Sequence, residues 1–84
     1  GISGSVRIED GVVIGGQAGF QGHHTIGKGA RIGGQSGVFA DVPAGEEWSG
    51  YPARPHRESL RTTAALFRLA GMVRQIEQLL GKKS

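Results

Sequence analysis

The chain has 84 residues, a net charge of +3 and no cysteine, so it forms at most one small domain without disulfides or thiolate metal sites. It contains no apolar run near 20 residues, which excludes a membrane-spanning helix within this sequence. The charge is uneven, because residues 1–50 contain three basic and five acidic residues whereas residues 51–84 contain seven and two. A basic tail on an acidic body suggests an acidic partner, although a solvated helix face produces a similar excess.

The first half of the chain repeats with a period of six residues. A large apolar residue occupies every sixth position, and the residue four places later is nearly always small or branched. Segments 8–19 and 26–37 match most closely, are offset by 18 residues and share the sequence I-G-G-Q-[A/S]-G. A helix repeats near 3.6 residues and a strand at two, so a sustained period of six predicts a parallel β-helix with three hexapeptides in each triangular coil. The apolar positions are Ile2, Ile8, Ile14, Phe20, Ile26, Ile32 and Val38.

These apolar side chains are expected to point into the coil and to stack on their equivalents in the next coil. Each buried isoleucine contributes roughly 1.5–3 kcal/mol to stability. We expect Ile8, Ile14, Ile26 and Ile32 to be buried, with Ile14 directly against Ile32. His24 stands in the row of small residues, and the pattern assigns it no role. A disordered glycine-rich segment is the alternative, but disordered chains lack such regular aliphatic spacing.

The glycines are concentrated in the repeat region, where fourteen of the sixteen lie in residues 1–50. Several occupy the second to fourth positions of the hexapeptides, which correspond to the corners of the coil. Glycine adopts positive φ without steric cost, so these residues are predicted to form left-handed turns. The residues concerned are Gly15, Gly16, Gly27, Gly29, Gly33 and Gly34.

The coil is predicted to be followed by a linker and a helical tail. Residues 1–48 form the coil, which ends in a strand near Glu47–Ser49. Residues 49–56 contain two prolines and a glycine, which are expected to prevent regular structure there. Residues 57–84 are helical in pattern, with a predicted break at Ala70-Gly71; the second helix would be too short to be stable alone in water. Its apolar stripe consists of Leu69, Met72, Val73, Ile76 and Leu80.

Four segments together resemble one family of hexapeptide-repeat acyltransferases. They read A-G-F-Q-G-H-H-T-I-G, I-G-G-Q-S-G-V, S-G-Y-P-A-R-P-H-R-E and R-T-T-A-A-L. The hexapeptides alone are typical of the whole superfamily, whereas their combination with the proline-rich exit and the helix resembles the C-terminal third of the UDP-3-O-acylglucosamine N-acyltransferases. The chain begins inside the hexapeptide register without a methionine, so we expect it to be part of a longer protein.

The resemblance implies a left-handed β-helix followed by C-terminal α-helices, although most crossover connections are right-handed. It also implies an acyltransferase of lipid A biosynthesis. That enzyme is a cytoplasmic homotrimer, with the inner face of the bacterial inner membrane as a second location. It transfers a 3-hydroxyacyl chain from acyl carrier protein to the 2-amino group of a UDP-sugar lipid substrate, with no cofactor and no metal. Its general base is a histidine that would precede Gly1, so this chain alone is expected to be inactive.

Particular residues acquire roles through the resemblance. Gly4 matches a glycine whose backbone N–H stabilises the oxyanion at the thioester carbonyl, a contribution worth several kcal/mol in such sites. His23 matches an accessory histidine that helps to bind the substrate or assists the reaction, although an exposed corner residue is the simpler interpretation. Arg57 and Arg61 match basic positions of the docking surface for acyl carrier protein, and Arg68 is added on charge alone.

Three other functions are alternatives to an acyltransferase. Nucleic-acid binding is disfavoured, because the basic helices have no interleaved aromatic residues and no recognition motif. A metalloenzyme similar to the γ-class carbonic anhydrases would need histidines spaced by five residues, whereas His23 and His24 are adjacent and cannot easily bind one metal ion. A non-catalytic trimeric scaffold, with the coil as a spacer and the helices as an interaction module, remains open.

Overall fold

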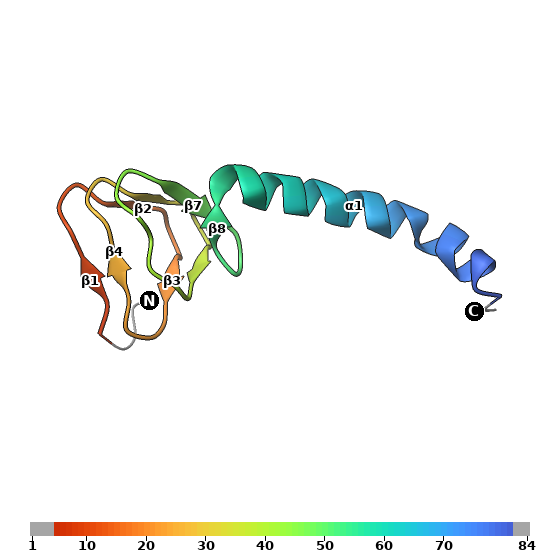
Figure 1. Cartoon of the computed structure of the whole chain (residues 1–84), viewed down its shortest axis with the longest axis horizontal. Helices are drawn as coiled ribbons and strands as arrows, with labels where there is room; N and C mark the ends of the chain where they lie inside the picture. Colours follow the sequence, from red (N-terminus) through yellow and green to blue (C-terminus); the bar gives the residue numbers. More distant parts are fainter. Residues whose placement is uncertain (1–4, 82–84) are drawn as a thin grey trace.

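The computed structural model describes residues 5–81, which form a small coil of short strands and one long projecting helix (Figure 1). The described part extends 54 × 23 × 19 Å. The elements in chain order are β1 (Arg7–Ile8), β2 (Val13–Ile14), β3 (Gly19–Phe20), β4 (Thr25–Ile26), β5 (Arg31–Ile32), β6 (Gly37–Val38), β7 (Glu47–Ser49), β8 (Arg54–Pro55) and α1 (His56–Leu79).

Three sets of parallel strands confirm the predicted repeat of 18 residues. β1 pairs with β4, β2 with β5, and β3 with β6. The facing residues are Ile8 and Ile26, Ile14 and Ile32, and Phe20 and Val38. Each pair is one predicted turn of the coil apart, so three hexapeptides make one turn with three faces.

The core lies inside the coil, and the burial of each core residue depends on having a neighbouring coil on both sides. Ile26 is 0% exposed, since Ile8 pairs with it on one side and Val42 on the other. Ile32 is 3% exposed, because Ile14 and Trp48 flank it. Ile8 and Ile14, however, are 37% and 38% exposed. The predicted burial of these two is therefore wrong within residues 5–81, although their register is right, because each has a described coil on one side only.

The segment that leads from the second coil to β7 is two residues shorter than the repeat predicts. Ile26 pairs with Val42 and Ile32 with Trp48, at offsets of 16 residues instead of 18. Val42 therefore takes the position of a first-place aliphatic residue, although the period of six puts it in the fifth place. This shortening brings Asp41 beside β4, where its Oδ1 accepts a hydrogen bond from the Thr25 backbone N–H at 2.8 Å.

The left-handed corners confirm one of the expected glycines, whereas most of them are formed by other residues. Among the six glycines named from the sequence, only Gly29 has positive φ. Gln17 and Gln35 take the left-handed conformation at the equivalent corners, with φ of 62° and 59°. Their side chains are joined by a hydrogen bond from Gln35 Nε2 to Gln17 Oε1 at 3.0 Å. A polar side chain that bonds to its equivalent in the next coil thus replaces glycine here.

Gly15 and Gly27 are required for a different reason, which is the close approach of successive coils. A Cβ atom on Gly15 would lie 2.7 Å from the Cα of Gly34, and one on Gly27 would lie 2.7 Å from the Cα of Ala44. Real Cβ atoms do not approach backbone so closely, so a side chain would push the coils apart. Gly16, beside Gly15, has open space where its Cβ would be.

The proline-rich exit folds back onto the last coil. β7 pairs in parallel with β5 and antiparallel with β8, so Trp48 faces Pro55. The guanidinium of Arg54 lies 5.9 Å from the centre of the Trp48 ring. The prediction of no regular structure over 49–56 is therefore wrong at Arg54–Pro55, because proline is tolerated on an edge strand where no N–H is needed.

The helical tail is one continuous α-helix, α1, so the predicted break at Ala70-Gly71 is wrong. Glycine in a helix costs roughly 1 kcal/mol relative to alanine but leaves the hydrogen-bond ladder intact. α1 contacts β7 and β8 at its start and then projects away from the coil (Figure 1). None of its described residues is buried. No helix among residues 5–81 is long and apolar enough to cross a membrane.

The two adjacent glycines provide a matched test of coil contact. We expect Gly15→Ala to lower the thermal unfolding temperature of the protein by several degrees, because overpacking costs about 1–3 kcal/mol. Gly16→Ala makes the same chemical change in open space and should leave the unfolding temperature within about a degree or raise it slightly. Equal effects of the two substitutions in thermal unfolding monitored by circular dichroism would contradict the close approach at Gly15.

Candidate functional site

The corner between β3 and β4 presents His23 to solvent. Gly22, immediately before it, has φ of +91°, a conformation that residues with a side chain rarely adopt. A Cβ at that position would also lie 2.8 Å from the Nε2 atom of His24. Because the His24 ring is the end of a side chain and can shift, it is the positive φ that requires glycine at Gly22.

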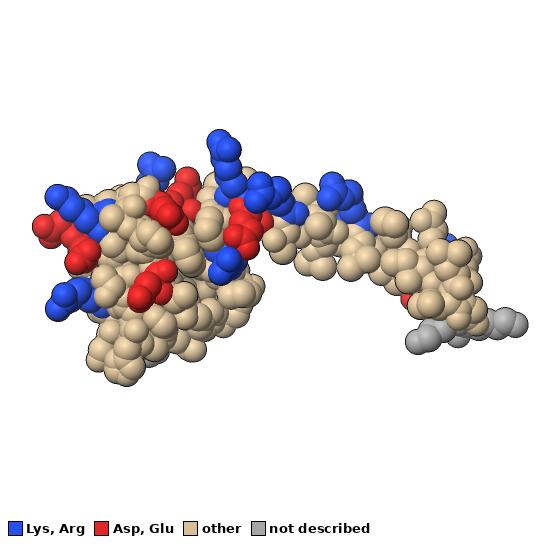
Figure 2. Space-filling view, in the orientation of Figure 1, with Lys and Arg blue, Asp and Glu red and all other residues tan. Residues whose placement is uncertain are grey.

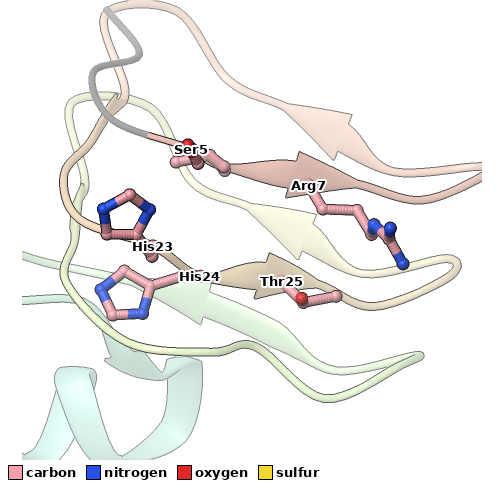
Figure 3. A pocket seen from close by; sticks show the side chains of 6 residues that line it. Ser5, Arg7, His23, His24 and Thr25 are labelled. Atoms are coloured by element: carbon pink, nitrogen blue, oxygen red, sulfur yellow. The ribbon is translucent and has the colours of Figure 1, made fainter.

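His23 and His24 line one open depression together with the neighbouring strand β1 (Figure 3). The depression has a volume of about 420 Å³. The backbone N–H of Arg7 donates to the His24 carbonyl oxygen at 2.9 Å, which holds the two strands together at its floor. The side chain of Arg7 extends away from the two imidazole rings along its strand (Figure 3). The lining residues are Ser5, Val6, Arg7, His23, His24 and Thr25.

The depression has the chemistry of a site for a polar ligand. Two imidazoles and two hydroxyl groups supply hydrogen-bond donors and acceptors, and the space is open to solvent on one side. Imidazole is also the side chain best suited to proton transfer near neutral pH. The arrangement can therefore bind a hydroxyl- or phosphate-bearing molecule and place an imidazole beside it.

His24 and Asp41 form a contact that sequence reasoning missed. His24 Nδ1 lies 3.6 Å from Asp41 Oδ1, an ion pair when the imidazole is protonated. The His24 side chain is one-quarter exposed and Asp41 is largely exposed. The period of 18 would have placed Asp41 next to His23, and only the shortened coil brings it beside His24. The loss of the six-residue period after Val38 was the one available signal that the register changes here.

Gly4, expected to stabilise an oxyanion, lies outside the described residues, so its role stays a prediction. Arg57, Arg61 and Arg68 all lie on α1 and are exposed. Their spacings of four and seven residues place them within an arc of about 40° at 100° per residue. Figure 2 shows basic side chains along one edge of the first part of the helix. Within residues 5–81, none of these three arginines forms an ion pair.

The described residues include no group of three histidine, cysteine, aspartate or glutamate side chains that could hold a metal ion. His56, the other histidine, is engaged elsewhere, since its Nδ1 lies 2.8 Å from the Ser49 hydroxyl. That hydrogen bond joins β7 to the start of α1. We therefore assign His56 to the attachment of the helix and not to the depression at His23.

The chain is similar to curated proteins that share one name. No protein-family model matches the chain. It is 58% identical over 71 residues to the UDP-3-O-acylglucosamine N-acyltransferase of Caulobacter sp. (strain K31), covering 84% of this chain and 21% of that protein. It is 51% identical over 77 residues to the protein of the same name from Methylobacterium nodulans, covering 92% of this chain and 22% of that protein.

A solved structure also resembles this one. Soybean serine acetyltransferase complexed with serine superposes with a TM-score of 0.56 and 46% sequence identity, over 57% of this chain and 20% of that chain. The likeness fits an acyltransferase built from hexapeptide repeats. The chain spans about a fifth of the length of the curated relatives that it matches. The resemblance predicted from the motifs is confirmed: over most of its length, this chain is similar to the UDP-3-O-acylglucosamine N-acyltransferases.

Proposed function

We propose that this chain is the C-terminal part of an N-acyltransferase that acts on UDP-3-O-acylglucosamine in lipid A biosynthesis. The observation that carries the proposal is the identity of 51–58% to proteins of that name over most of the chain. The coil is then left-handed, as in the family that it resembles. The reaction uses a UDP-sugar and an acyl carrier protein thioester, which places it in the cytoplasm at the inner face of the inner membrane.

The reaction joins an amine to an activated acyl group. The 2-amino nitrogen of the sugar attacks the thioester carbonyl, a C–N bond forms and the C–S bond breaks. The proton of the amine passes to a general base, and the thiol of the carrier leaves. In the family that the chain resembles the base is a different histidine, so we assign residues 1–84 an accessory group. The exposed imidazole of His23, in a depression with hydroxyl groups, supports an accessory role in holding the acceptor sugar.

Replacing His23 by alanine tests this role in the full-length enzyme. His23→Ala should lower kcat/KM for the aminosugar acceptor about tenfold, because a positioning group contributes less than the factor of about 10²–10⁴ typical of a general base. Gln21→Ala changes an exposed residue in the same corner and serves as the control. Steady-state kinetics that follow the amide product would contradict the proposal if both variants matched the wild type.

The basic face of α1 supports docking of an acidic carrier protein. We define this face by Arg57, Arg61 and Arg68, which share one side of a helix that leaves the coil and is open to solvent. Exposed charges of this kind act chiefly on the rate of association, and salt screens them beyond about 10 Å at 0.1 M. Acyl carrier protein is the partner that the resemblance implies, and its negative charge complements the basic face.

Charge reversal on the basic face should affect the acyl donor alone. We expect Arg57→Glu combined with Arg61→Glu to raise the KM for acyl carrier protein thioester several-fold, less so at high salt, with the acceptor KM unchanged. The single variants Arg61→Glu and Arg74→Glu give a matched comparison. Both reverse one charge on the same helix, but Arg74 lies roughly 140° around the helix from Arg61. An effect of Arg74→Glu as large as that of Arg61→Glu would point to overall charge instead of a docking face.

A second face of α1 supports assembly into a homotrimer. Apolar or small residues recur at alternating spacings of four and three, which is the pattern of a coiled-coil seam. The seam is centred about 120° around the helix from the basic face, so both can function at once. Among the described residues of α1 none is buried, and a helix of this kind gains its stability by packing. We define the seam by Thr62, Leu66, Leu69, Val73 and Ile76 of α1 together with Leu80, which directly follows the helix.

The seam can be separated from general hydrophobicity by one paired experiment. Val73→Glu should weaken the trimer and lower its unfolding temperature by several degrees, because a charge would be buried between helices. Phe67 is 72% exposed and lies on the opposite side of the helix, so Phe67→Glu should leave both quantities unchanged. Sedimentation velocity and thermal unfolding measure the outcome. A monomeric wild type, or equal effects of the two variants, would rule out the seam.

A further inference from the structure

The side chain of His24 has a neighbour on two sides at the corner beside His23. On one side, its Nδ1 lies 3.6 Å from Asp41 Oδ1. On the other side, its Nε2 lies where it would meet a Cβ of Gly22 at 2.8 Å. The imidazole thus lies between the carboxylate of the following coil and the backbone of the turn that carries His23. Figure 3 shows both histidine rings projecting from this one corner.

The partner of His24 is itself fixed by the fold. Asp41 Oδ1 accepts the backbone N–H of Thr25 at 2.8 Å, and the backbone N–H of Val42 donates to the Thr25 carbonyl oxygen at 3.0 Å. Both backbone groups of Thr25, its N–H and its carbonyl, are therefore hydrogen-bonded to the next coil. Because Asp41 is anchored in this way, its contact with His24 fixes the corner that carries His23 relative to the following coil.

Packing alone does not account for an imidazole at this place. The equivalent positions of neighbouring hexapeptides hold Val12, Ala18, Ala30 and Ser36, and the last three of these are buried. A polar ring that is three-quarters buried is stable only when its nitrogen atoms find partners. For Nδ1 the partner here is the carboxylate of Asp41, and the ring lies beside Gly22 in the turn before His23.

We propose that His24 and Asp41 form a positioning pair that sets the orientation of His23 in the acceptor site. The inference rests on the proposed function of His23, and it adds that His24 acts through His23 instead of on the substrate. Asp41 holds the His24 ring, the ring supports the turn at Gly22, and the turn directs His23 into the depression. Misplacement of an active-site group by about 1 Å can cost up to about a hundredfold in rate.

A double-mutant cycle in the full-length enzyme tests the pair. His24→Val installs the residue found at Val12, so it fits the coil and removes the imidazole. It should lower kcat/KM for the acceptor about tenfold or more, without raising the KM of the acyl donor. In a His23→Ala background, the same substitution should have almost no further effect, because residues that act as one unit are not additive.

A conservative variant separates positioning from packing. His24→Asn keeps a nitrogen donor in the place of Nδ1 and should retain most of the activity that His24→Val loses. Thermal unfolding of each variant shows whether it is folded, and crystal structures show whether the turn at Gly22 has moved. In His24→Val the turn should be displaced, and in His24→Asn it should keep its place.

The outcomes are distinct. An inactive wild type would overturn the proposed function, and the crystal structures would still decide whether His24 positions the turn. With an active wild type, three results would each overturn the positioning pair. These are unchanged kinetics in His24→Val, losses that multiply with that of His23→Ala, and a His24→Asn variant as impaired as His24→Val.

Discussion

Contact between successive coils is the constraint on which the whole body depends. Backbone hydrogen bonds run from one coil to the next, for example from the Gly15 N–H to the Ile32 carbonyl oxygen and from the Gly33 N–H to the Trp48 carbonyl oxygen, both at 2.8 Å. Strands of two or three residues cannot be stable alone, since an isolated pair of strands is marginal in water. Each strand therefore exists because another coil lies against it, and the same contacts bury the isoleucine row.

This dependence explains why burial is graded along the coil. Ile26 and Ile32 have coils on both sides and are buried, whereas Ile8 and Ile14 occupy the same register with one described neighbour each. At the other end, Trp48 closes the row above Ile32, and the antiparallel strand β8 returns beside it. The proline-rich segment that contains β8 thus covers the last aliphatic layer. The hydrogen bond between Ser49 and His56 attaches the first residue of α1 to the edge of that layer.

The corner at His23 and the helix α1 carry different kinds of surface groups. The corner gathers imidazole and hydroxyl groups that suit a polar acceptor, and its shape comes from rigid coil contacts. The helix meets the coil only near its start and presents an arginine face and an apolar seam on different sides. A rigid corner is suited to positioning small groups, whereas an extended helix offers the long, solvated surface that protein partners need.

The amino-acid sequence determined the period and the strand register up to Val38, because both are local patterns that the hexapeptides repeat. It also determined the family resemblance, through the combination of the repeats with the proline-rich exit and the helix. The pairing of Ile14 with Ile32 followed from counting alone. Tertiary structure decided the rest. Two of the left-handed corners are formed by Gln17 and Gln35, since a side-chain hydrogen bond between coils can replace glycine there. Glycine is required at Gly15 because the backbone of Gly34 lies too close for a side chain. The shortened coil placed Asp41 against His24 and Thr25, a contact that no period encodes because it arises where the period ends.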